Sequence, residues 1–261
     1  MSCGTSPPDK AGINRPDARS HGYAPPVEMR WRIRLDGAPQ DLDRLRRELA
    51  TGDVVVREDD MGTYLQATTF ESFTDGDQVV PAAEALIVRL NGIFSLSGGY
   101  QSVSFSGRVE RDDSAWVYVS DAARLVDVAL TADGVVSGAD GVVKSSPGPS
   151  HGMRQLQAAD DHPAVAEAYR ILGLKPSPSW NEFYKVYEVL REAYGGSDSD
   201  LSERTGVSQR RIEKLTATSN HQLLSGDEAR HAAMKGTPSS RRKITKDEGR
   251  AIVNDLIEGF A

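Results

Sequence analysis

Hydrophobic and charged residues alternate along residues 27–35, in the stretch VEMRWRIRL. Successive side chains of a β-strand point to opposite faces, so this period of two predicts a strand with one buried and one solvated face. The leucines that follow at positions 42, 45 and 49 have helical spacing and predict a helix. Two further strand-like stretches, 53–58 and 63–70, flank four turn-forming residues and predict a hairpin.

A second helix is expected to begin at Pro81, because proline suits the first turn of a helix, and to end by Gly92. Strands then follow at about 101–110, 115–120 and 124–131. The resulting order is strand, helix, strand, strand, helix, strand, with two strands appended. A split βαβ arrangement has this order, with two helices covering one face of an antiparallel sheet. We therefore predict an α+β fold that begins with such a sheet domain.

Composition divides the chain into four parts. Residues 1–26 contain five of the 13 prolines and almost no aliphatic residues, so we expect a disordered tail. The sheet domain is predicted for 27–136, and a Gly/Ser/Pro-rich linker for 137–159. Beyond the linker the hydrophobic spacing becomes helical, which predicts an all-helical domain over 160–261.

Two helices of this predicted domain have clear starting signals. Ser179 and Glu182 have the spacing of a capping box, and Thr245 and Glu248 repeat it. In such a box each side chain satisfies a backbone N–H group of the other residue. Both boxes precede amphipathic stretches, so we expect helices to begin there.

Charge is divided unevenly along the 261 residues. The whole chain has 31 Lys and Arg against 38 Asp and Glu, a net charge of −7 with a pI near 5.3. The last 61 residues hold 11 basic and 8 acidic residues, a net charge of +3, which leaves −10 for the rest. Positive potential is therefore expected at the C-terminal end of the chain.

Composition also narrows the class of protein. No stretch approaches the roughly 18 apolar residues that a membrane-spanning helix needs, and no apolar signal segment is evident near Met1. The one cysteine, Cys3, excludes a multi-cysteine zinc site, and no two histidines have ligand spacing on one element. We expect a cytoplasmic protein with no membrane contact, no metal and no cofactor.

The most specific local pattern covers residues 200–215, DLSERTGVSQRRIEKL. It resembles the helix-turn-helix of bacterial DNA-binding proteins, with a small residue, Ser202, where the helices touch and Gly206 at the turn. Gly206 can adopt the left-handed conformation that a short turn needs, and Ser208 can cap the second helix. The helices would be locked together by Leu201, Val207, Ile212 and Leu215. The outward side chains, suited to base edges and phosphates, would be Gln209, Arg210, Arg211 and Lys214.

A second resemblance spans roughly residues 180–260. Its motifs are an aromatic helix of the form W…YKxYE at 180–188, a TxN turn at 218–220 and the sequence ARH at 229–231. These motifs resemble the C-terminal region of a widespread group of uncharacterised bacterial proteins. The resemblance implies a common helical fold and carries no known activity.

Arg230 and His231 suggest an alternative function, because small helical ribonucleases of the HEPN type pair an arginine with a histidine. The arginine would stabilise phosphate charge, and the histidine would act as general acid or base. Adjacent helical residues point about 100° apart, so catalysis here would need Asn220 or His221 as a convergent partner. In the structural alternative, Arg230 pairs with a carboxylate such as Glu188 or Glu182, His231 is a packed histidine and Asn220 forms a turn.

The sequence therefore favours a non-enzymatic cytoplasmic binding protein whose helical domain contacts nucleic acid, either DNA or RNA, or a partner protein. The candidate nucleic-acid-binding residues are Gln209, Arg210, Arg211 and Lys214. Two alternatives stay open: a metal-independent ribonuclease using Arg230 and His231 with Asn220, and a protein–protein adaptor with no nucleic-acid role.

Overall fold

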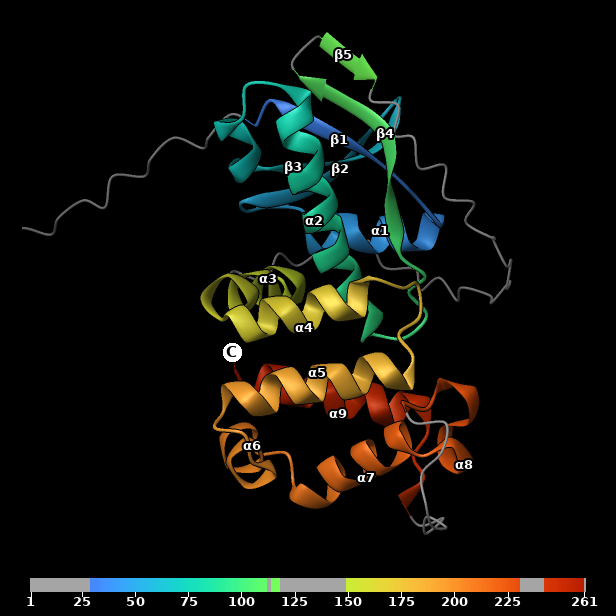
Figure 1. Cartoon of the computed structure of the whole chain (residues 1–261). Coiled ribbons are helices and arrows are strands. Elements are labelled where there is room, and N and C mark those ends of the chain that lie inside the picture. Colours follow the sequence, from blue (N-terminus) through green and yellow to red (C-terminus); the bar gives the residue numbers. More distant parts are fainter. Residues whose placement is uncertain (1–28, 112–113, 118–148, 231–241, 261) are drawn as a thin grey trace, which may run out of the picture.

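A computed structural model describes residues 29–111, 114–117, 149–230 and 242–260 (Figure 1). The predicted disordered tail at 1–26 and the predicted strand at 124–131 lie outside the described residues. Most of the predicted linker, up to residue 148, lies outside them as well.

A five-stranded antiparallel sheet forms the N-terminal part of the protein. Its strands are β1 (Trp31–Gly37), β2 (Val54–Asp59), β3 (Gly62–Ala67), β4 (Val103–Arg111) and β5 (Ser114–Val117). The spatial order is β2-β3-β1-β4-β5, so β3 separates the helix-connected strands β1 and β2. In the centre of the sheet Ile33 lies opposite Leu65 on one side and Val109 on the other. The predicted α+β fold with a split βαβ sheet is confirmed.

Two helices, α1 (Pro39–Glu48) and α2 (Gly76–Ser95), cover one face of the sheet, and Figure 1 shows α2 lying across it. A short 3₁₀ helix, η1 (Thr68–Ser72), connects β3 with α2. The alternate residues Trp31, Ile33 and Leu35 of β1 are buried against these helices, as the period of two predicts.

Arg34, predicted to lie on the solvated face of β1, is buried. Its guanidinium donates two hydrogen bonds to Glu110, at 3.0 and 2.8 Å, and two to Asp59, at 2.5 and 2.9 Å. A fifth bond, of 2.9 Å, reaches the carbonyl oxygen of Gly62. All five N–H groups are therefore satisfied, which makes burial of this cation tolerable. The prediction for this side chain was wrong because strand periodicity carries no information about carboxylates on neighbouring strands.

The second helix begins earlier than predicted. Asp75 caps α2 by accepting a hydrogen bond of 3.0 Å from the backbone N–H of Gln78, and Pro81 lies inside the helix. The first four N–H groups of a helix have no acceptor in any case. Pro81 follows them closely, so it removes only one bond near the start of a 20-residue helix.

The C-terminal part is helical, and within the described residues no helix is long and apolar enough to cross a membrane. Its longer helices are α3 (His151–Asp161), α4 (Pro163–Gly173), α5 (Trp180–Ala193), α6 (Asp198–Thr205), α7 (Gln209–Asn220) and α9 (Lys246–Glu258). Two short elements, α8 (Gln222–Ser225) and η2 (Gly226–Glu228), follow α7. The predicted starts of α5 and α9 are confirmed, since each has its capping box.

Helix α3 begins within the predicted linker 137–159, so the helical part starts at residue 151 rather than 160. The side chain of Ser150 caps this helix by accepting a hydrogen bond of 3.2 Å from the backbone N–H of Met153. Ser150 belongs to the Gly/Ser/Pro-rich stretch that indicated a linker. The stretch has the composition of a linker, but a serine can also cap a helix, and Ser150 does so here.

The two predicted domains share one hydrophobic core. Helices α2 and α4 are in backbone contact: a Cβ atom on Gly92 would lie 2.0 Å from the carbonyl oxygen of Tyr169. A Cβ atom on Gly173 would lie 1.8 Å from the carbonyl oxygen of Val88. Only glycine permits this approach, so α3 and α4 join the sheet part to the helices α5–α9 (Figure 1).

Candidate nucleic-acid interface

Helices α6 and α7 are joined by a turn of three residues, 206–208. The side chain of Ser197 starts α6 by accepting a hydrogen bond of 3.1 Å from the N–H of Asp200. Gly206 ends α6 in the left-handed conformation, with φ of 71°, and its N–H donates to the Ser202 carbonyl at 2.9 Å. Gly206 therefore has the predicted conformation, one that a residue with a Cβ adopts only at a cost.

The inner sides of α6 and α7 are held together by the apolar residues that the motif predicts. All four are buried: Leu201, Val207, Ile212 and Leu215. Helix α9 supports the pair from behind, because the end of α9 touches the end of α6 where Gly259 meets Thr205. The inner sides of both helices therefore belong to the core, and this packing determines which side of α7 faces outward.

Ser208 occupies the N-cap position of α7 with extended backbone, but its side chain makes no capping hydrogen bond with the described residues. The prediction that it caps the helix through its hydroxyl was wrong. The carbonyl of Ser208 instead accepts from the N–H groups of Arg211, at 2.8 Å, and Ile212, at 3.2 Å. The N–H groups of Gln209 and Arg210 belong to the first turn, where a helix offers no backbone acceptor.

The four predicted contact residues fall into two groups. Gln209 and Arg210 are exposed at the start of α7, and Arg210 has no ion-pair partner among the described residues. Arg211 instead forms an ion pair with Asp255 of α9, with 2.6 Å between Nη1 and Oδ2. Lys214, one turn further along α7, is half-buried. A hydrogen bond from the backbone of Thr245 and, to a smaller extent, the charge of Lys214 lower the pKa of Glu248.

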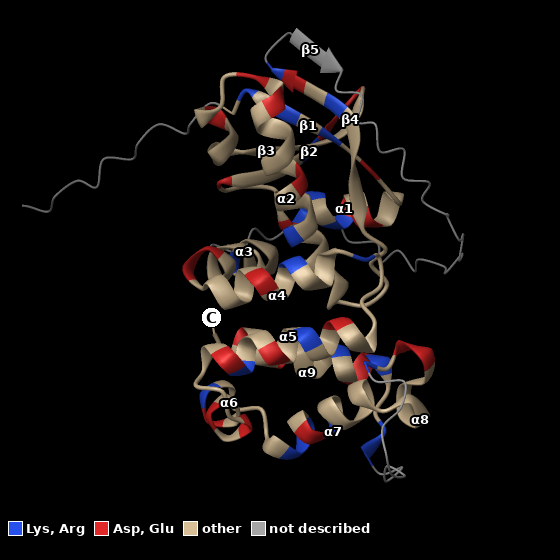
Figure 2. Ribbon diagram, in the orientation of Figure 1, with Lys and Arg blue, Asp and Glu red and all other residues tan. Residues whose placement is uncertain are grey.

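Two further cations lie beside the other end of α7. The hydroxyl of buried Thr218 donates to the carbonyl of Arg242 at 3.0 Å and accepts from the N–H of Ile244 at 3.3 Å. These bonds hold the exposed residues Arg242 and Lys243 next to the last turns of the helix. Figure 2 shows Lys and Arg at the start of α7 and again in this short stretch. The run RRK at 241–243 could have indicated them from the sequence.

We call this set the α7 basic surface: Gln209, Arg210, Lys214, Arg242 and Lys243. Acidic residues limit its extent. The span 198–220, which covers α6 and α7, holds four basic and four acidic residues. The positive surplus of this region therefore comes from the start of α7 and from residues 242–243, rather than from the motif as a whole.

Arg230 lies at the opposite end of α7 from Arg210. Its backbone N–H donates to the carbonyl of Ser219 at 2.9 Å. Ser219 follows Arg210 by nine residues, which at 1.5 Å per residue is a distance of about 14 Å along the helix. Arg230 therefore does not lie beside Arg210 at the start of α7.

The Arg230 guanidinium is an ion-pair partner of Glu188, at 3.0 Å, and lies 4.5 Å from the centre of the Tyr184 ring. This confirms one part of the structural alternative, the pairing of Arg230 with a carboxylate such as Glu188. Asn220 ends α7, and its carboxamide oxygen is buried without a hydrogen-bond partner within the described part of the chain. His231, the other candidate for ribonuclease chemistry, lies outside the described residues.

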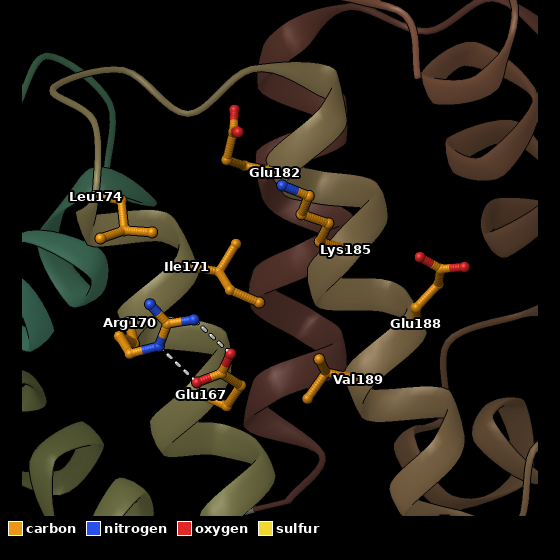
Figure 3. A pocket seen from close by; sticks show the side chains of 8 residues that line it. All are labelled: Glu167, Arg170, Ile171, Leu174, Glu182, Lys185, Glu188 and Val189. Carbon is orange, nitrogen blue, oxygen red and sulfur yellow. Dashed lines mark hydrogen bonds and ion pairs between the residues drawn. The ribbon is translucent and has the colours of Figure 1, made fainter. Parts of the chain in front are cut away.

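A shallow pocket of about 270 Å³ lies between α4 and α5 (Figure 3). Ile171, Leu174 and Val189 form its apolar lining. Arg170 donates to Glu167 at 2.6 and 2.7 Å, which lowers the pKa of that carboxyl. Arg170 and Glu167, both at the pocket, therefore pair with each other. No cluster of His, Cys, Asp or Glu among the described residues could hold a metal.

Comparisons of the chain with protein-family models, with curated proteins and with solved structures find no match. The resemblances to a helix-turn-helix and to the uncharacterised bacterial group therefore remain predictions.

Proposed function

We propose that this protein binds double-stranded DNA through the N-terminal half of α7. The observation that carries the proposal is the position of Arg210, which is exposed at the start of α7 and has no ion-pair partner among the described residues. Helix α7 is the second helix of the proposed helix-turn-helix. In DNA-binding proteins of this architecture, the first residues of that helix contact base edges in the major groove. Gln209 and Arg210 are suited to adenine and guanine respectively.

Duplex DNA fits this surface better than duplex RNA. The major groove of B-form DNA is about 12 Å wide and admits a helix, whereas the major groove of A-form RNA is too narrow. Lys214, Arg242 and Lys243 follow α7 toward its other end, where they can contact phosphates. The proposed ligand is therefore a B-form duplex with α7 in its major groove.

A protein partner on this surface is less well supported. Protein interfaces depend on a buried apolar or aromatic centre. The large apolar residues that are exposed in the described part of the chain, Met61, Leu174 and Leu223, lie on other elements. The α7 basic surface consists of polar and charged side chains, which suits a polyanion.

The test is an anisotropy titration of the full-length protein against a labelled duplex of about 20 base pairs, from about 50 to 200 mM salt. The double variant R210A/K214A should bind more weakly, because it loses one proposed base contact (Arg210) and one proposed phosphate contact (Lys214). Its slope of log K against log salt should be shallower by about 0.9, the contribution of one phosphate contact. R47A/R57A is the matched control, since both arginines are exposed on α1 and β2.

The control R47A/R57A should have almost the same affinity and slope as the parent protein, apart from a small effect of its lower net charge. The absence of binding by the parent at about 50 mM salt would contradict the proposal, because electrostatic binding is strongest there. Equal losses in the two double variants would show that total charge, and not the α7 basic surface, governs binding.

A further inference from the structure

Arg211 differs from its neighbour Arg210 in one respect that bears on DNA binding. Its guanidinium lies 2.6 Å from the carboxylate of Asp255 on α9, whereas Arg210 has no such partner within the described residues. Both members of the pair stay accessible, with 43% of the Arg211 side chain and 40% of the Asp255 side chain exposed. A cation that could contact a phosphate is therefore held by a carboxylate of its own chain.

The other carboxylates of α9 are engaged within that helix or its cap. Asp247 pairs with Arg250, Glu248 accepts from Thr245, and Glu258 accepts from Asn254. Asp255 is thus the α9 carboxylate that pairs with the arginine beside the start of α7.

An ion pair of this exposure is weak. Solvated pairs contribute from zero to about 1 kcal/mol, because water screens the attraction and two long side chains lose freedom. A phosphate that reaches Arg211 can therefore replace Asp255, and it meets the repulsion of that carboxylate as it does so. This repulsion lowers the binding free energy that a phosphate gains from Arg211, but it does not prevent the phosphate from binding there.

We propose that Asp255 is an internal competitor of the DNA backbone for Arg211, and that it sets the affinity and salt dependence of the α7 basic surface. The inference rests on the proposed DNA binding by α7. With the pair intact, Arg211 adds little to binding. Without the Asp255 charge, Arg211 becomes one more phosphate contact at the start of the helix.

The test is D255N, which keeps the size of the side chain and removes its charge. We expect duplex DNA to bind about fivefold more tightly at low salt, the factor that corresponds to a pair of about 1 kcal/mol. The slope of log K against log salt should steepen by about 0.9, which is one added contact. In the background R211A, D255N should give almost no gain, because the released cation is absent.

D160N is the matched control. Asp160 forms an exposed ion pair with Arg89 at 2.6 Å, so D160N makes the same change of net charge and also breaks one surface pair, but it does so on α3. An equal gain in D160N, an unchanged affinity of D255N, or a gain that persists in R211A/D255N would each overturn the competitor role.

These results are distinct from a failure of DNA binding itself. If the parent binds and R210A/K214A weakens it while D255N changes nothing, the proposed function stands and the competitor role falls. If neither the parent nor D255N binds duplex DNA, both fall.

Discussion

Replacing Arg34 by methionine tests whether its buried ion network holds the sheet together. The guanidinium joins three strands, because it bonds to Glu110 on β4 and to Asp59 and Gly62 at the β2–β3 hairpin. Breaking a buried pair by removing one partner costs about 3–5 kcal/mol, mainly because a charge is left without compensation. R34M leaves two such charges, those of Glu110 and Asp59.

Two features place the expected loss of unfolding free energy near the lower limit of this range, about 3 kcal/mol. Arg108 lies 2.7 Å from Glu110 and can still neutralise it, and the Asp59 side chain is 30% exposed and can recover water. We therefore expect R34M to lower the free energy of unfolding by about 3 kcal/mol. For a chain of this size that corresponds to a fall in Tm of roughly 6–12 °C.

Urea unfolding followed by circular dichroism measures this change, provided that the slope with denaturant stays constant. R32M is the control, because Arg32 is 40% exposed and lies 3.7 Å from Asp59. Its loss should stay within about 0.5 kcal/mol. A loss below about 1 kcal/mol for R34M, or equal losses in both variants, would refute the view that this network bears on stability.

The same network predicts a pH dependence. Hydrogen bonds from Arg34 lower the pKa values of Asp59 and Glu110 below their ordinary values of 3.8 and 4.5. The stabilisation is therefore present above those ordinary values and is lost as the pH falls through the lowered ones. R34M lacks it, so the stability difference between the parent and R34M should stay constant above about pH 5 and narrow as the pH falls below the ordinary values of 4.5 and 3.8. A difference that widens on acidification would contradict this assignment.

Two other substitutions follow from the packing. G92A should lower the free energy of unfolding by about 3 kcal/mol or more, measured by urea unfolding, because its Cβ would lie 2.0 Å from the backbone oxygen of Tyr169. The control G76A should be neutral or slightly stabilising, because nothing lies within 4 Å of its Cβ. Similar losses in both variants would argue against the α2–α4 contact. Burial raises the pKa of Asp41 above 3.8, although the N–H of Gln101 donates to it. Ionised Asp41 therefore lowers stability as the pH rises through its folded pKa, and the Tm of D41N should exceed that of the parent by an amount that grows with pH; a gap that shrinks would refute the assignment.

The parts of the fold that the sequence predicted depend on neighbours along the chain. The alternation around Trp31 predicted β1, the pair Thr245 and Glu248 predicted the start of α9, and Gly206 predicted the turn before α7. Each signal lies within a few residues of the structure it specifies. The split βαβ arrangement was also predicted, because the order of strands and helices along the chain leaves few arrangements in which both helices cover one face.

The parts that were missed depend on contacts between distant segments. Arg34 is buried because Glu110 lies on the adjacent strand, 76 residues away in sequence. Arg211 is paired because α9 returns Asp255 to the start of α7. The supposed linker contains the start of α3, and Gly92, predicted to end a helix, is instead a contact point between helices. Composition and periodicity describe each segment alone, so they could not reveal which segments meet.

The most direct test of DNA binding by α7 is amide hydrogen exchange of the full-length protein with and without saturating duplex DNA at low salt. We expect slower exchange at residues 208–216 and at 242–244, with no change in β1–β3. Bound DNA that leaves exchange in α7 unchanged, or that protects only the pocket between α4 and α5, would contradict the account.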